Sequence, residues 1–207
     1  YAAPKKQQLK VRNASSIKEF RREEWNALFG EKGCFDWDGL KFLEDSFTDG
    51  ERPEDSWSFH YVLISDGEKP ILATFFTFGL WKDDMLSPAS VSLKLEEKRK
   101  ADPYYLTTQV LSMGSLFTEG EHLYLDREHP QAAVAMQMLF EYLQELEQEL
   151  WPEAIVLRDF EEDTYLNKIF HDHGFVKVRM PDSCVFRDLS WENEEGKSQF
   201  QRIPVGH

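Results

Sequence analysis

The chain has 207 residues, of which 41% are hydrophobic and 14% aromatic, which is enough for one sizeable core in a single domain. Its 38 acidic residues outnumber its 24 basic ones, and the formal net charge of −14 argues against nucleic acid or an anionic membrane as a partner. The sequence has no apolar run of about eighteen residues, so we expect no membrane-spanning segment.

The cysteines indicate the redox compartment of the protein, and the two ends of the chain indicate the boundaries of its domain. Cys34 and Cys184 are the only cysteines, with no CxxC pair and no metal-ligand spacing of histidines, so we expect a reducing cytoplasmic compartment and no metal site. The chain begins with Tyr rather than Met, as expected of a fragment of a longer protein. Residues 1–8 are predicted to be a linker, residues 9–191 one domain, and residues 192–207 a charged tail.

The N-terminal part of the domain is predicted to contain one strand and two helices. Residues 9–12 alternate as a short strand, and residues 15–29 follow as a helix capped by a serine and ended by a glycine. A second helix begins at Asp36 or Asp38, because either aspartate can accept hydrogen bonds from the first free amides.

A hairpin follows these helices. Residues 57–64 alternate in the period of a strand, and residues 71–81 are almost wholly apolar. The turn-forming residues 65–70 between them predict an antiparallel pair.

The next segment, residues 82–120, has no single interpretation. It contains the cluster KLEEKRK at residues 94–100 and a loop-like run at residues 102–105. Residues 109–120 fit either a strand with a glycine bulge or a loop that lines a pocket. A long insertion of mixed chemistry beside a ligand site is more often functional than incidental.

The C-terminal part is organised around a strand, a long helix and a second strand. Residues 122–125 and 154–157 are short apolar runs, and between them apolar side chains recur at helical spacing over residues 132–150. A helix that crosses between two strands predicts that they pair in parallel. A shorter helix then ends at Gly174, and residues 175–186 predict one or two further strands.

This order of elements, with a Gly-Phe pair closing the second helix, resembles the acyl-CoA-binding half of the GNAT acetyltransferase superfamily. The resemblance implies an α/β (α+β) fold in which a mixed central β-sheet of about six or seven strands is flanked by about four helices. In that family the loop before the long helix reads Q/R-x-x-G-x-G/A, and its amides hold the pyrophosphate of coenzyme A. Gln131 matches the motif here, whereas Val134 and Met136 replace its two glycines. Such glycine-poor versions are similar to FemAB-type and peptidoglycan-related acyltransferase domains.

The resemblance also implies where an acyl donor would bind. The donor would lie against the backbone at the start of the long helix, where the helix dipole favours an anion. The implied donor-binding residues are Leu123, Leu125, Arg127, His129, Gln131 and Val134. His129 has an ordinary alternative as a residue of the helix entry.

Catalytic candidates follow from the same resemblance. The tyrosine that serves the family as an acid falls on Phe170, which has no proton to donate. Glu119 and Glu121 are candidates for the base that deprotonates the acceptor amine, with a solvated turn as the alternative. Tyr124 and His171 are candidates for the acid, although a histidine at a helix C-terminus is also favourable in itself. We favour Glu121 as the base and Tyr124 as the acid.

Two functions of different classes are therefore expected. The first is an N-acyltransferase that moves an acyl group from an acyl-CoA or acyl-carrier thioester, as a weakly bound co-substrate, to a small-molecule or other amine. The alternative is a catalytically degenerate GNAT-like binding or regulatory module of a larger enzyme, fused or as a partner, which the lost glycines favour. Aminoacyl transfer from tRNA is disfavoured by the acidic charge.

Overall fold

The computed structural model describes residues 8–162 and 164–179, which belong to two compact units divided after Thr164. The strands and helices of the first unit are, in chain order, β1 (Lys10–Ala14), α1 (Arg22–Phe29), α2 (Trp37–Phe47), β2 (Ser58–Asp66), β3 (Lys69–Lys82), α3 (Ala89–Arg99), β4 (Thr107–Met113), β5 (Tyr124–Leu125), α4 (Ala132–Leu150) and β6 (Ala154–Leu157). The short 3-10 helices η1 (Ile17–Glu19) and η2 (Pro53–Asp55) precede α1 and β2. The second unit contains α5 (Thr164–Asp172), whose first residue lies at the division.

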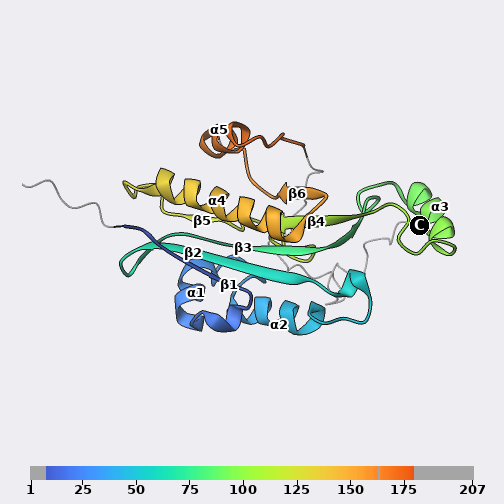
Figure 1. The fold of residues 1–207 in the computed structure, drawn as a ribbon, viewed down its shortest axis with the longest axis horizontal. Coiled ribbons are helices and arrows are strands. Elements are labelled where there is room, and N and C mark those ends of the chain that lie inside the picture. The colour runs from blue at the N-terminus through green and yellow to red at the C-terminus, as the bar shows by residue number, and fades with distance from the viewer. Residues whose placement is uncertain (1–7, 163, 180–207) are drawn as a thin grey trace, which may run out of the picture. The chain divides into compact units, whose positions relative to one another are not determined.

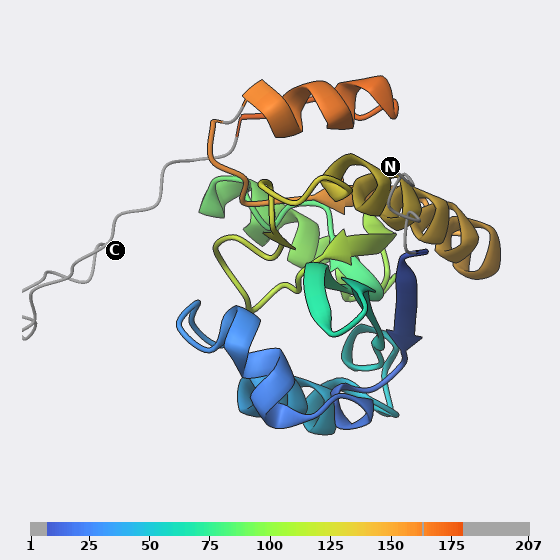
Figure 2. The ribbon, with the colours of Figure 1, turned by 90° about the vertical axis from the view of Figure 1, so that its left-hand side faces the viewer.

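One mixed sheet forms the middle layer of the first unit. The strand order is β1-β2-β3-β4-β6, and β5 pairs with β3 alone. Helices α1 and α2 cover one face of the sheet and α4 covers the other, as Figures 1 and 2 show. The predicted α/β fold with a mixed sheet of about six or seven strands is confirmed, since the described residues form a six-stranded sheet. Helix α3 is an addition to the helices that the sequence predicted.

The β2/β3 hairpin is antiparallel, as predicted, and its alternation supplies both faces of the sheet with core residues. On the α1 and α2 side, Phe59, Tyr61 and Phe75 belong to one large buried cluster with the aromatic residues of those helices. The intervening residues Val62 and Ile64 are fully buried and point to the opposite face. Residues 61–64 of β2 are buried on both faces because helices cover both sides of the sheet.

The predicted single helix over residues 15–29 is wrong, because the segment is broken into η1 and α1. Ser16 Oγ accepts the Lys18 N–H at 3.2 Å, which caps η1 as a short turn. Phe20 then takes an extended conformation, with φ −104° and ψ 145°, so the helical hydrogen bonding cannot continue through it. The second predicted helix is confirmed, since Asp36 caps α2 through the Gly39 N–H at 2.8 Å.

The predicted parallel pairing of residues 123–125 with residues 155–157 is also wrong. Strand β5 pairs antiparallel with β3, at Leu72 and Ala73. The parallel partner of β6 is β4, from Val110 opposite Ala154 to Met113 opposite Leu157. Both β5 and β6 run antiparallel to β3, so they share a direction, and the α4 helix does cross between them. The sequence identified the crossover correctly but not the strand that pairs with β6.

Helix α4 buries the apolar stripe that its sequence predicts. Its buried residues are Ala132, Ala135, Met136, Leu139, Phe140, Tyr142, Leu143 and Leu146. Gln131 is the N-cap residue, and the helix ends at Trp151 in a left-handed conformation with φ 52°.

In the second unit, α5 ends as the sequence indicates. Gly174 has φ +87°, the left-handed conformation expected after a helix C-terminus, and the Phe175 N–H donates to the Phe170 carbonyl at 3.0 Å. Residues 175–179 form no strand, contrary to expectation. The remainder of the expected strand segment, residues 180–186, lies outside the described residues, as does the predicted tail.

Candidate functional site

The candidate site lies where two parallel strands part. Strands β4 and β6 pair as far as Met113 and Leu157. Gly114, with φ +82°, then turns the chain out of β4 into a loop over residues 115–123, and β5 resumes the pairing with β3. We call residues 115–123 the splay loop. Because β5 pairs with β3 alone, the edge of β5 that faces away from β3 has no strand partner among the described residues.

Buried hydroxyl groups hold the splay loop together. Thr118 Oγ1 accepts the Ser115 N–H at 2.8 Å and lies within hydrogen-bond distance, 2.8 Å, of His122 Nε2. Arg158, just after β6, donates from Nη1 to the Ser115 carbonyl at 2.9 Å. The chain segments that follow β4 and β6 are therefore bonded to each other at the point where the strands separate.

Arg158 is itself oriented by its neighbour. Its Nε donates to Asp159 Oδ2 at 2.8 Å, and the two side chains are only 15% and 20% exposed. Asp159 has φ 63°, a left-handed conformation that aspartate tolerates better than most residues. The end of β6 thus presents a fixed guanidinium and carboxylate next to the splay loop.

His122 is a buried titratable residue of this site that the sequence analysis did not single out. Its side chain is 0% exposed, and its ring lies 5.0 Å from that of Phe35 and 5.7 Å from that of Phe75. Burial lowers the pKa of His122 to about 4; Asp159 opposes this effect and Arg158 adds to it. The imidazole is therefore neutral at pH 7. Its Nδ1 atom has no hydrogen-bond partner among the described residues.

The loop between α1 and α2 lies against the splay loop. Lys32 Nζ is 3.4 Å from Glu121 Oε2, and Cys34 Sγ is 3.6 Å from the Phe117 carbonyl oxygen. This side of the site therefore brings together residues more than eighty positions apart in the sequence.

A stack of three aromatic rings forms the outer part of the splay loop. The Phe117 ring lies 5.1 Å from that of Phe47 and 5.6 Å from that of Trp57, with interplanar angles of 28° and 20°. Phe117 remains 58% exposed, whereas Trp57 is buried. The stack anchors the loop to α2 and to the residue just before β2, and it leaves an aromatic side chain in solvent.

The predicted catalytic residues fall into two groups. Glu119, Glu121 and Tyr124 lie together on the splay loop and the strand that follows it, the first two exposed and Tyr124 half-buried against the core. His171 lies in the second unit, on α5, with a side chain that is 86% exposed and an Nδ1 atom 3.9 Å from Asp172 Oδ1. The roles assigned to all four stay predictions.

The predicted donor-binding residues lie along β5 and the entry to α4. Leu123 is buried, Leu125 is half-buried in β5, and Arg127 is exposed. Val134, in the first turn of α4, is 45% exposed. His129 Nε2 is 3.6 Å from Asp66 Oδ2, so its imidazole contacts the β2/β3 hairpin.

In the loop that enters α4, two backbone N–H groups already donate to side chains of the same loop. Asp126 Oδ1 accepts the Glu128 N–H at 3.2 Å, and His129 Nδ1 accepts the Gln131 N–H at 3.2 Å. Lys69 Nζ lies 2.7 Å from Asp126 Oδ2, and this hydrogen bond holds the pKa of the Asp126 carboxyl below its usual range. The Asp126 carboxylate of this loop is therefore ionised and paired with Lys69.

The sequence contained a weak signal for the residues that were missed. A glycine within a strand pattern indicates a bulge or a close approach, and Gly114 provides the close approach, because the His122 ring packs directly over it. Nothing local distinguishes His122 from a solvent-exposed histidine, since its burial depends on Phe35 and Phe75 from distant segments.

In the part of the chain that the structure describes, no group of three or more His, Cys, Asp and Glu side chains could hold a metal ion. No helix there is long and apolar enough to cross a membrane.

Neither protein-family models nor curated protein sequences match this chain. Among solved structures it is similar to the aminoglycoside N-acetyltransferase AAC(6′)-Iy in complex with CoA, at 13% identity and a TM-score of 0.50 over 90% of this chain and 100% of that one. A ribosomal-protein-alanine N-acetyltransferase from Brucella melitensis biovar Abortus 2308 matches at 9% identity over 86% of this chain and all of the other, with a TM-score of 0.46. The first of these likenesses shows that the chain has the fold of a GNAT N-acetyltransferase.

Proposed function

We propose that the protein is an N-acyltransferase that moves an acyl group from an acyl-CoA thioester to an amine. The observation that carries the proposal is the separation of β4 from β6 after Met113 and Leu157. The edge of β5 that has no strand partner among the described residues leads from there into the N-terminus of α4. An extended donor that contains amide groups fits such an edge as an added strand. Its thioester would then lie near the splay loop and Arg158.

The reaction requires the protein to position the two substrates and to transfer protons. The amine nitrogen attacks the thioester carbonyl carbon, the carbon–sulfur bond breaks, and the thiolate leaves. Glu121, or Glu119 beside it, takes the proton that the ammonium group loses before attack. As the amide forms, the nitrogen loses a second proton, which balances the proton that Tyr124 or water gives to the thiolate. His122 contributes indirectly, because its contact with Thr118 helps to hold the loop that carries both glutamates.

The alternative function is a binding or regulatory module that has kept the fold and lost catalysis. The Glu128 and Gln131 amides of the α4 entry loop favour this alternative, because both already donate to side chains of the loop and are not free to hold a pyrophosphate. A module of this kind belongs to a larger enzyme, fused or as a partner. A FemAB-type relationship, and a carrier-protein thioester in place of acyl-CoA, are finer versions of the enzyme hypothesis.

The donor site is tested by binding. We expect coenzyme A and acetyl-CoA to raise the melting temperature, since a ligand that binds only the native state stabilises it. The double variant Arg127→Ala, Gln131→Ala should weaken binding by about tenfold, which corresponds to about 1.4 kcal/mol. Titration calorimetry measures the change, and Arg22→Ala, an exposed position on α1, is the control. Tight binding that the double variant leaves unchanged would mean that the donor lies elsewhere.

The catalytic assignment is tested by transfer to a panel of amines across pH. We expect Glu121→Gln to lower kcat/KM by about a hundredfold, the usual contribution of a general base, with smaller losses in Glu119→Gln, Tyr124→Phe and His171→Ala. Glu68→Gln, in the exposed β2/β3 turn, should behave as the wild type. Full activity in all four variants would refute the assignment. Absence of transfer by the wild type from any thioester would favour the binding module.

A further inference from the structure

Lys32, in the loop between α1 and α2, holds its amine against the carboxylate of Glu121. Its Nζ atom lies 3.4 Å from Glu121 Oε2, and the two residues are 89 positions apart in the sequence. The same nitrogen is 5.8 Å from the centroid of the Phe29 ring at the end of α1, a placement in which the ring face attracts a cation. Groups from two different elements therefore hold one primary amine at the splay loop.

Lys32 is less exposed than five other lysines of the first unit that pair with carboxylates. Its side chain is 31% exposed. The side chains of the other five are between 40% and 70% exposed, namely Lys18, Lys41, Lys69, Lys82 and Lys100. An acylating reagent in solution should therefore reach Lys32 more slowly than these five lysines.

Glu121 lies close to the place where β4 and β6 separate. The splay loop folds back on itself, because Thr118 Oγ1 accepts the Ser115 N–H at 2.8 Å and lies 2.8 Å from His122 Nε2. Arg158 donates to the Ser115 carbonyl at 2.9 Å, so the segment after β6 meets the start of the loop. The end of the loop that carries Glu121 is therefore bonded, through Thr118, to the end at which the donor thioester is proposed to lie.

We propose that Lys32 is a self-acylation site, an inference that rests on the proposed function because the donor and the base are the same. The amine of Lys32 accepts an acyl group from an acyl-CoA thioester, with Glu121 as the base. The structure already places this lysine amine against the carboxylate that is proposed to deprotonate acceptor amines. Lys32 therefore occupies the position of an acceptor.

The step balances as the aminolysis of a thioester. The Lys32 ammonium group first gives one proton to Glu121. Nζ then attacks the carbonyl carbon, the carbon–sulfur bond breaks, and its electron pair leaves with the sulfur. As the amide forms, Nζ loses a second proton, which balances the proton that the thiolate takes up. The products are acylated Lys32, free coenzyme A and one proton, which Glu121 returns to solvent.

Acylation changes the charge beside the proposed base. An amide nitrogen carries no charge, so the acylated side chain no longer forms an ion pair with Glu121. The Lys32 ammonium group then ceases to compete for this carboxylate with the ammonium group of an incoming acceptor. Because the amide is stable, each chain undergoes the change once.

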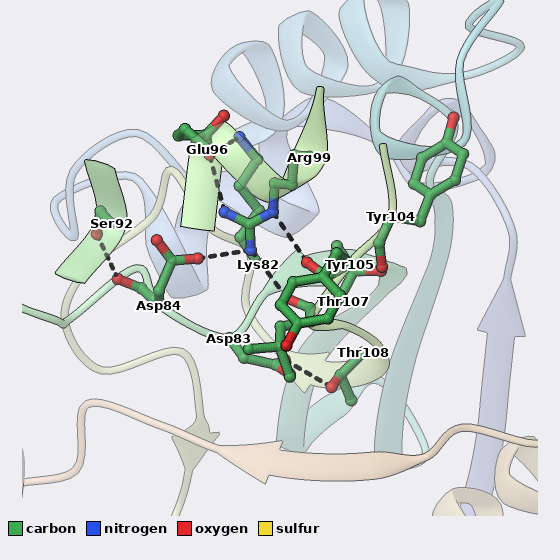
Figure 3. Close-up of polar contacts among 11 residues, drawn as sticks. Lys82, Asp83, Asp84, Ser92, Glu96, Arg99, Tyr104, Tyr105, Thr107 and Thr108 are labelled. Atoms are coloured by element: carbon green, nitrogen blue, oxygen red, sulfur yellow. Dashed lines mark hydrogen bonds and ion pairs between the residues drawn. The ribbon is translucent and has the colours of Figure 1, made fainter. Parts of the chain in front are cut away.

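The site is tested on the full chain with deuterium-labelled acetyl-CoA, and the labelled lysines are identified by peptide mass spectrometry. We expect the label to enter Lys32 at least about tenfold faster than Lys82, although Lys82 is more exposed. Lys82 is the matched control because its Nζ also pairs with a carboxylate, at 2.9 Å from Glu96 Oε1, and because it lies opposite Thr107, at the far end of β4 from the splay loop. Figure 3 shows Lys82 and Glu96 together with Arg99, which also binds this carboxylate.

Substitution of the paired carboxylates separates catalysis from chemical acylation. In uncatalysed acylation a neighbouring carboxylate keeps an amine protonated and slows its attack, so removing the carboxylate should speed labelling. Glu96→Gln should therefore leave the labelling rate of Lys82 unchanged or raise it. Glu121→Gln should instead lower the labelling rate of Lys32 by about a hundredfold, because the base is lost. Melting temperatures check that both variants fold.

The order of the reaction shows whether a chain modifies itself. The rate constant for labelling Lys32 should not depend on the concentration of the chain, because donor, base and acceptor amine belong to one molecule. A rate constant that rises in proportion to this concentration would mean that one copy modifies another, and it overturns self-acylation. A Lys32 labelling rate that Glu121→Gln leaves unchanged or raises also overturns it.

Parallel assays of transfer to free amines, with the same donor, distinguish this site from the proposed function. Transfer to free amines without faster labelling of Lys32 than of Lys82 overturns the self-acylation site and leaves the proposed function standing. Fast labelling of Lys32 that depends on Glu121, without transfer to any free amine, supports the site and contradicts the proposed transfer to other amines. Absence of both kinds of transfer overturns the site and the proposed function together.

Discussion

Gly114→Ala is expected to destabilise the first unit by about 2–5 kcal/mol, the sum of a left-handed backbone term and an overpacking term. The glycine has φ +82°, and a Cβ atom placed there would lie 2.6 Å from the His122 ring. That ring is held between Phe35 and Phe75 and by Thr118, so it has little room to move away. Urea unfolding followed by tryptophan fluorescence measures the loss.

The control separates backbone strain from packing. Gly33 has φ +93°, and a Cβ added to it meets no atom within 4 Å, so Gly33→Ala incurs the backbone term of about 1–2 kcal/mol alone. The double variant Gly114→Ala, His122→Ala should lose less stability than the sum of the losses in the two single variants, because removing the ring removes the clash. Equal losses of stability in Gly114→Ala and Gly33→Ala would mean that the His122 ring does not pack against Gly114.

The pH dependence of stability is expected to report the burial of His122. Its pKa is 6.5 in an unperturbed setting and about 4 in the folded protein. Between these values the unfolded chain binds a proton that the folded chain does not, so the free energy of unfolding falls as the pH is lowered from about 6.5 to about 4. Below that range both states are protonated and the loss stops. The total loss is on the order of 3 kcal/mol.

Two variants isolate this contribution from that of the carboxylates. His122→Gln should flatten the dependence between pH 6.5 and 4, and the slope that remains includes His60, whose pKa burial also lowers. His60→Gln should remove the smaller part of the slope that comes from His60, because burial lowers the pKa of His60 as well. Denaturant titrations at several pH values provide the measurement. An unchanged slope in His122→Gln would show that the imidazole is hydrated in the folded state.

Local patterns were sufficient for most of the elements. The alternation of residues 57–64 and the helical spacing of residues 132–150 appear as β2 and α4, because a strand or helix with a buried face must repeat its apolar side chains at the period of its own geometry. Asp36 and Gly174 mark helix ends for an equally local reason. The helix over residues 15–29 failed at Phe20, since the sequence pattern does not exclude an extended residue inside a helical period.

Local patterns could not predict which strands pair, nor the helix in residues 83–106 between β3 and β4. The apolar run at residues 122–125 predicts a strand, but its pairing with β3 depends on where the splay loop returns the chain. Residues 83–106 bury a guanidinium in place of an apolar stripe, so α3 has few of the periodic apolar positions by which a helix is identified.

By itself, the sequence determined the nature and order of most of the main elements and the crossover helix, because these depend on periodicity and on short signals along the chain. The order of these elements resembles that of an acyltransferase fold. Only the tertiary structure decided that β4 is the partner of β6, that His122 is buried between Phe35 and Phe75, and that Glu121 meets Lys32. The physical reason is that burial, pKa and strand pairing depend on which distant segments cover a residue. Those contacts form only when the whole sheet and its helices pack together.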